Sequence, residues 1–139
     1  MTPIEKTTDP DAVFWSTHRL QATIPSILQR GEPLQLRLTV FGPDGLPSAA
    51  LDRDVEVGPC PGIEGMPARL RFDPVLGGHL TVDGLRAGQA GCAYVALRPE
   101  GCPAEVVSNA AWILDDEPQA RLWWGDLHIH TTFSNCSAW

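Results

Sequence analysis

Lysine is almost missing from this 139-residue chain, in which Lys6 is the only copy. The 10 Lys and Arg residues face 17 Asp and Glu, which gives a formal net charge of -7, and the basic residues form no cluster. Nucleic acid and anionic membrane surfaces are bound through clustered positive charge. We therefore expect neither as a partner.

Signals for membrane insertion and secretion are also lacking. No apolar run approaches the roughly 20 residues that a membrane-spanning helix needs. Residues 1–11 are polar and carry no apolar stretch of the kind found in secretory signals. We therefore expect a cytoplasmic protein.

The four cysteines, Cys60, Cys92, Cys102 and Cys136, form no CxxC motif of the kind found in zinc sites and redox proteins. Their wide and irregular spacing predicts free or buried thiols in a reducing compartment. A Cys92–Cys102 disulfide is the alternative, since these two residues could flank a hairpin or a loop.

Glycine and proline, with 13 residues each, fall between short apolar stretches, as is typical of an all-β domain. No sustained helical periodicity precedes residue 120. Leu34, Leu36, Leu38 and Val40 alternate with polar residues, as in a half-buried strand. The expected strands cover residues 20–28, 33–41, 55–58, 68–72, 79–82, 91–97 and 104–114.

Turns are expected between these strands, among them Gly77-Gly78 and Asp83-Gly84. Short strands at this spacing favour an Ig-like β-sandwich of two sheets over residues 1–114. Residues 115–120 are expected to form a linker, because they are acidic or polar at the start and contain Pro118.

A new strand is predicted over residues 121–129. Trp123, Leu127 and Ile129 lie on one face of it, whereas Asp126 and His128 lie on the other. An apolar face opposite a polar one suits the first strand of a barrel-like α/β domain, of which residues 121–139 would be an incomplete start. Active sites of such barrels lie at the C-terminal ends of the strands.

Asp126, His128 and His130 are spaced two residues apart along this strand, so their side chains share a face. Two imidazoles and a carboxylate that converge are typical ligands of a metal ion. The simpler alternative is that the histidines are polar residues on a short exposed strand. Two or three ligands do not complete a site, so we expect further ligands beyond Trp139.

The longer string around these residues resembles the opening motif of the PHP (polymerase and histidinol phosphatase) superfamily, a strand ending in His-x-His before a Thr/Ser-rich turn. It is also similar to a branch of PHP-like proteins in which a β-sandwich precedes the metal domain. The residues that carry the resemblance are Leu122-Trp123-Trp124-Gly125-Asp126-Leu127-His128-Ile129-His130-Thr131-Thr132-Phe133-Ser134, led upstream by Ser108-Asn109.

The resemblance implies a distorted β/α barrel that carries Zn, Mn or Fe ions and hydrolyses a phosphoester substrate. It makes His128 and His130 metal ligands and gives Asp126 the role of orienting an imidazole. Cys136 departs from the pattern, since relatives often carry an acidic residue there. Because the later ligand motifs are absent, residues 1–139 alone are expected to be inactive, with no catalytic residue assigned, whereas the intact protein is expected to be a hydrolase.

Two other hypotheses stay open. The sandwich could be a binding module for a carbohydrate or another protein, which an exposed aromatic platform on one sheet would support. Alternatively, His128, His130 and Cys136 could form a small metal site on dimerisation. In the enzyme hypothesis, the sandwich packs on the barrel and shapes substrate access, or mediates self-association into a homo-oligomer.

The remaining polar candidates have simpler explanations. His18 and His79 stand beside no partner motif and are expected to be ordinary surface or hydrogen-bonded residues. Arg69 and Arg71 share one face of a predicted strand and could receive an anion, although a solvated face is the simpler expectation.

Overall fold

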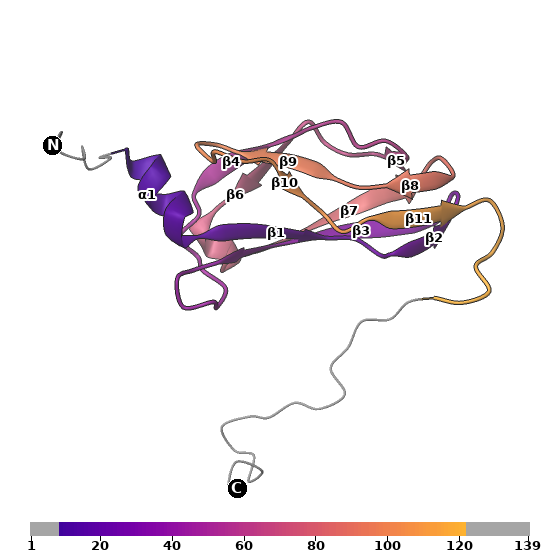
Figure 1. Ribbon diagram of the computed structural model, residues 1–139, viewed down its shortest axis with the longest axis horizontal. Helices are drawn as coiled ribbons and strands as arrows, with labels where there is room; N and C mark the ends of the chain where they lie inside the picture. The colour runs from indigo at the N-terminus through magenta and orange to yellow at the C-terminus, as the bar shows by residue number, and fades with distance from the viewer. Residues whose placement is uncertain (1–8, 122–139) are drawn as a thin grey trace, which may run out of the picture.

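The computed structural model describes residues 9–121 (Figure 1). Apart from the helix α1 (Pro10–Thr17) and the short 3-10 helix η1 (Pro74–Leu76), the regular structure of these residues is β, which confirms the expected all-β class. No helix among them is long and apolar enough to cross a membrane. The strands are β1 (Arg19–Thr23), β2 (Ile27–Gln29), β3 (Pro33–Phe41), β4 (Arg53–Val57), β5 (Ile63–Glu64), β6 (Arg69–Phe72), β7 (His79–Ala87), β8 (Gly91–Ala93), β9 (Ala96–Pro99), β10 (Val106–Val107) and β11 (Ala111–Leu114).

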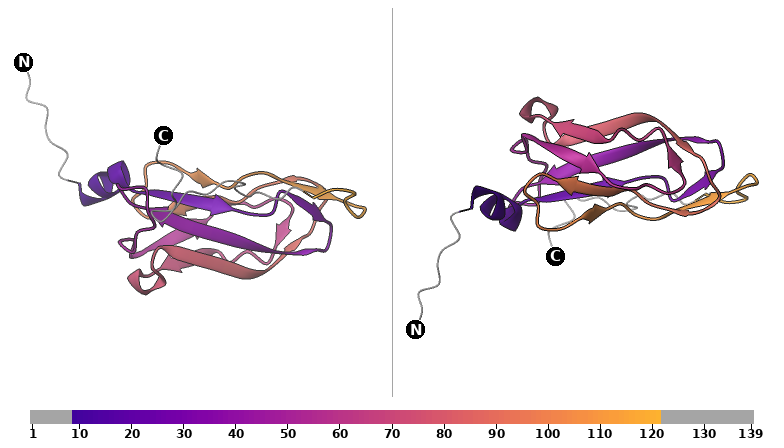
Figure 2. Two further views of the ribbon diagram at one scale, coloured as in Figure 1. Left: turned by 90° about the horizontal axis from the view of Figure 1, so that it is seen from below. Right: turned by 90° about the horizontal axis from the view of Figure 1, so that it is seen from above.

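The strands form three sheets, not the two that were expected, in the orders β1–β3–β7–β5, β10–β9–β4–β6 and β2–β11–β8. Within the described residues every strand pair is antiparallel except β2 with β11. Leu36, Phe72 and Ile113, one from each sheet, belong to a single buried core. Figures 1 and 2 show α1 at one end of the strands and residues 115–121 at the opposite end.

The predicted alternation along β3 is confirmed. Leu34, Leu36, Leu38 and Val40 are all buried, with exposed fractions of 5%, 0%, 1% and 0%. The residues between them are exposed or half-buried and form the outward face of the sheet β1–β3–β7–β5. Burial of these four aliphatic side chains, each contributing about 1.5–3 kcal/mol, fixes which face of β3 is turned to solvent.

Three segments predicted as single strands are each divided in two, which corrects the expected boundaries. Residues 20–28 form β1 and β2, residues 91–97 form β8 and β9, and residues 104–114 form β10 and β11. In each case the chain passes from one sheet to another at the break. A strand that changes sheet has to bend, and at the first break Pro25 also lacks the N–H that would continue a ladder.

The expected turn at Asp83-Gly84 is instead a β-bulge inside β7. Between the pairs on either side of it, β3 advances by two residues and β7 by three. Gly84 has a φ of 78°, in the left-handed region that glycine adopts without strain. The extra residue keeps Leu85 on the buried face while Asp83 and Gly84 remain exposed.

The sequence analysis did not predict the helix α1. The Asp9 side chain accepts a hydrogen bond from the N–H of Asp11, and Pro10 occupies the first turn. Phe14 and Trp15 are partly buried and pack against the core. A helix of 8 residues is too short for its apolar spacing to stand out, and the Asp9-Pro10 pair is the signal that marks its start.

Candidate functional site

The predicted metal ligands His128 and His130, with Asp126 beside them, lie outside the described residues, as does Cys136 of the alternative dimeric site. Within residues 9–121, no group of three or more His, Cys, Asp or Glu side chains lies close enough to hold a metal ion. The metal site therefore stays a prediction from the sequence.

The two described histidines are bound by their own neighbours. The Nδ1 atom of His18 lies 3.0 Å from the hydroxyl of Thr17, and its ring stacks on Phe14 with 4.1 Å between centroids. The Nδ1 atom of His79 lies 3.2 Å from the hydroxyl of Thr39 on the adjacent strand. Both are ordinary hydrogen-bonded residues, as expected.

The described cysteines, Cys60, Cys92 and Cys102, are free thiols, which confirms the favoured expectation for these three. The alternative Cys92–Cys102 disulfide is wrong. Cys92 lies on β8 and Cys102 follows β9, and these two strands belong to different sheets. The hairpin that would have brought the two thiols together does not form, because the chain changes sheet between them.

Arg69 and Arg71 form no free anion site, because carboxylates on β4 and immediately before it neutralise them. The guanidinium of Arg71 pairs with Asp52, and that of Arg69 lies 3.5 Å from the carboxylate of Asp54. Asp54 and Arg71 are also partners in the β4–β6 register. These pairs are largely exposed and stabilise the sheet only slightly.

The segment expected as a linker, residues 115–120, is attached to the β2–β3 turn at both ends. At its first residue, the carboxylate of Asp115 lies 2.9 Å from the guanidinium of Arg30. After it, Arg121 donates two hydrogen bonds to the carboxylate of Glu32, with lengths of 2.7 and 3.2 Å. Fork-to-fork pairing of this kind fixes orientation as well as distance. The chain therefore leaves the described residues from a fixed position beside the turn.

The Glu32 carboxyl is also tied to its own turn. It accepts a hydrogen bond of 2.8 Å from the N–H of Gln29. Burial raises the pKa of Glu32, but the hydrogen bonds from Arg121 and Gln29, together with the charge of Arg121, outweigh it. The net effect lowers the pKa below its ordinary value of 4.5, so the carboxylate is charged and paired at neutral pH.

Ser108 and Asn109, the upstream residues of the PHP-like string, have structural contacts. The Asn109 side chain accepts a hydrogen bond of 2.9 Å from the N–H of Ile24 and donates one of 2.8 Å to its carbonyl oxygen. The hydroxyl of Ser108 accepts a bond of 2.9 Å from the N–H of Val95 and donates to the carbonyl of Asn109. Both residues thus hold backbone at points where the chain changes sheet.

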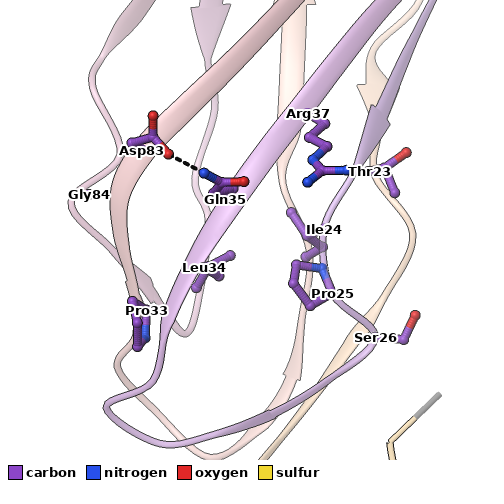
Figure 3. A pocket seen from close by; sticks show the side chains of 10 residues that line it. All are labelled: Thr23, Ile24, Pro25, Ser26, Pro33, Leu34, Gln35, Arg37, Asp83 and Gly84. Carbon is purple, nitrogen blue, oxygen red and sulfur yellow. Dashed lines mark hydrogen bonds between the residues drawn. The ribbon is translucent and has the colours of Figure 1, made fainter. Parts of the chain in front are cut away.

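A hollow of about 640 Å³ lies beside the break between β1 and β2 (Figure 3). Its buried floor includes Ile24 and Leu34, and Arg37 projects over one side of it. On the opposite side, the amide of Gln35 donates a hydrogen bond to the carboxylate of Asp83. The full lining is Thr23, Ile24, Pro25, Ser26, Pro33, Leu34, Gln35, Arg37, Asp83 and Gly84.

The lining of this hollow holds one guanidinium, that of Arg37, and one carboxylate, that of Asp83, which accepts a hydrogen bond from Gln35. The sequence analysis did not identify this hollow. The available signal was Arg37, a lone basic residue on the outward side of a strand with perfect alternation. That signal is weak, since most such residues are simply solvated.

Two aromatic side chains on or beside the sheet β2–β11–β8 are exposed. Trp112 of β11 is 56% exposed, and Tyr94, which follows β8, is 42% exposed. Trp112 is the register partner of both Ile27 on β2 and Cys92 on β8, so the three form a row across the sheet. Residues 115–120 border the same surface and enclose with it a hollow of about 620 Å³.

A scan against models of known protein families finds no match to this chain, and a search of curated proteins finds no significant similarity. The resemblance to PHP proteins therefore rests on the motif residues themselves.

Proposed function

We propose that residues 121–139 begin a PHP-type metal-dependent phosphoesterase domain, preceded by an Ig-like β-sandwich over residues 1–114. The string from Trp124 to Thr131, with His128 and His130 at its end, is the observation that carries this proposal. Two imidazoles and a nearby carboxylate form a donor set that suits Zn, Mn or Fe. A cytoplasmic location belongs to the proposal and is supported by the free thiols of Cys60, Cys92 and Cys102.

In this proposal His128 and His130 bind metal, and Asp126 accepts a hydrogen bond from an imidazole N–H to hold the ring in orientation. The metal would supply Lewis acidity for a phosphoryl oxygen and a bound water of lowered pKa. The remaining ligands would come from chain beyond Trp139. Residues 1–139 alone are therefore proposed to be inactive.

The described residues are proposed to position the metal domain. The bidentate contact between Arg121 and Glu32 supports this role, since it holds the start of that domain beside the β2–β3 turn. A domain attached at a fixed point has fewer orientations to search than one on a free tether. The sandwich would then shape access to the substrate without contributing to the chemistry.

The test is hydrolysis of p-nitrophenyl phosphate by the protein together with whatever chain follows Trp139. His128→Ala and His130→Ala should abolish hydrolysis, and a chelator should do the same. His18→Ala and His79→Ala are matched controls, because within residues 9–121 each histidine bonds to a neighbouring threonine, and they should retain activity. Hydrolysis that survives both motif substitutions would reject the proposal.

A second candidate function is a carbohydrate- or protein-binding module, and the exposure of Trp112 and Tyr94 is the observation that favours it. Exposed aromatic side chains are typical of surfaces that bind sugar rings or protein partners. The same surface could mediate self-association. Two measurements test this function, namely binding to a glycan array and dimer formation in sedimentation. Binding or a dimer that is lost in Trp112→Ala, and that a chelator does not affect, would favour this function over the hydrolase.

A further inference from the structure

Arg37 is the one arginine within residues 9–121 whose guanidinium has no hydrogen-bond, ion-pair or ring partner among those residues. Every other arginine there contacts a carboxylate, a carbonyl oxygen or an aromatic ring. These are Arg19, Arg30, Arg53, Arg69, Arg71, Arg86, Arg98 and Arg121. A chain with a net charge of -7 offers many carboxylates, yet none of those described pairs with Arg37. Its guanidinium lies over a hollow and is therefore available to an external anion.

Two threonines flank Arg37 across the sheet. Thr23 on β1 and Thr81 on β7 are both its register partners, and all three residues are exposed. Neither hydroxyl has a partner within the described residues. Side chains directly opposite each other on neighbouring strands lie about 5 Å apart. The row therefore presents hydroxyl, guanidinium and hydroxyl donors side by side, which suits a planar carboxylate.

The other side of the hollow is rich in acceptors. Gln35 is two residues from Arg37 along β3, a distance of about 6.6 Å. Its amide donates to Asp83, so its own carbonyl oxygen, which points toward Arg37 in Figure 3, and the second oxygen of Asp83 take no part in that bond. These oxygens accept hydrogen bonds from hydroxyl groups. The negative charge of Asp83 also disfavours a ligand that is anionic throughout.

The walls of the hollow are held rigid. Asn109 fixes both backbone groups of Ile24 on one side, and the bulge at Gly84 fixes the position of Asp83 on the other. Pro25 adds an apolar rim that cannot rotate about φ. A preformed hollow of about 640 Å³ is of the size that holds small ligands.

We infer that this hollow binds a small carboxylate whose body carries hydroxyl groups, the chemistry of a sugar acid. The carboxylate lies against Arg37 and Thr23, and the hydroxyl groups of the ligand donate to Gln35 and Asp83. This inference is independent of the proposed hydrolase and needs no metal.

The test is calorimetric or NMR titration of the 139-residue chain with glucuronate, in the presence of a chelator. Glucose lacks the carboxylate, acetate lacks the hydroxyl groups, and inorganic phosphate is anionic throughout, so each should bind at least about tenfold more weakly than glucuronate. Arg37→Gln should weaken glucuronate by about tenfold or more. Arg19→Gln is the matched control, because Arg19 lies on the same sheet over the Phe41 ring, and it should leave binding unchanged.

Asp83→Asn is a second variant that alters the acceptor side, and it should weaken glucuronate while leaving acetate binding unchanged. Absence of saturable glucuronate binding would overturn the inference. Equal binding of phosphate or acetate, or undiminished binding by Arg37→Gln, would overturn it as well. Because metal is chelated throughout, none of these outcomes depends on the proposed phosphoesterase.

Discussion

The side-chain amide of Asn109 bonds to both the N–H and the carbonyl oxygen of Ile24, at 2.9 and 2.8 Å. Ile24 is 3% exposed and is the first residue after β1, where the chain leaves one sheet for another. At that point neither of its backbone groups can be paired by a neighbouring strand. Asn109 thus replaces a missing strand partner, and it does so from a position two residues before the start of β11.

Asn109→Ala should lower the free energy of unfolding by about 2–4 kcal/mol, because it leaves two buried backbone groups unpaired. Urea unfolding measures this change. Asn109→Asp keeps the acceptor for the Ile24 N–H but sets a carboxylate oxygen against the Ile24 carbonyl oxygen in place of the donor. We therefore expect it to lower the free energy of unfolding at neutral pH at least as much as Asn109→Ala. An unfolding midpoint of Asn109→Ala equal to that of the unsubstituted chain would show that water satisfies these groups.

Gly78→Ala should be much more destabilising than Gly77→Ala. Both glycines have a positive φ, 87° and 62°, so both alanines carry the backbone strain of about 1–2 kcal/mol. At Gly78, however, an added Cβ would lie 2.5 Å from the carbonyl oxygen of Ser48, whereas nothing lies within 4 Å at Gly77. Comparing the thermal unfolding of the two variants separates the cost of backbone strain from the cost of steric overlap. Equal losses would mean that the loop carrying Ser48 yields freely.

Glu32→Gln tests the contact between Glu32 and Arg121, because the stability that this contact provides depends on pH. The pKa of Glu32 is lowered in the folded chain, so the stabilisation is fully present above the ordinary carboxyl pKa and is lost as the pH falls through the lowered value. The pair is partly exposed, and we expect a difference of less than about 1 kcal/mol at neutral pH. Unfolding free energies at about pH 7 and about pH 3, for both chains, measure it. If the two chains still differ in unfolding free energy in acid, the difference arises from something other than the ion pair.

Strand positions followed from the sequence better than strand connections did. The alternation of Leu34, Leu36, Leu38 and Val40 located β3 and its buried face, because side-chain period is a local property. The divisions at Pro25 and near Tyr94 did not follow from the sequence. Both halves of each divided segment bury side chains in the same core, so the hydrophobic pattern runs on through a change of sheet.

The candidate site shows a similar limit. His128 and His130 are predicted as metal ligands because their spacing and neighbours have a chemical meaning in one dimension, and this prediction lies outside the described residues. The row of Thr23, Arg37 and Thr81 exists only through the register of three strands, which no local pattern specifies. The structural role of Asn109 was hidden for the same reason, since its partner Ile24 lies far away in the sequence.

Asp126→Asn should weaken metal binding of the intact protein by about 10–100-fold without removing it. An asparagine can still accept a hydrogen bond from an imidazole, but it carries no charge to support the ligand. Competition with a fluorescent chelator measures the affinity. A complete loss of metal would instead make Asp126 a direct ligand, and an unchanged affinity would remove it from the site.

The most direct test of the account is metal content by plasma mass spectrometry, on residues 1–139 and, in parallel, on the protein extended by its following chain. We predict two or more Zn, Mn or Fe ions per extended chain, almost none on residues 1–139, and loss of metal from the extended chain when His128 and His130 are replaced by alanine. An extended chain that binds no metal would contradict the account and leave the β domain as the functional part.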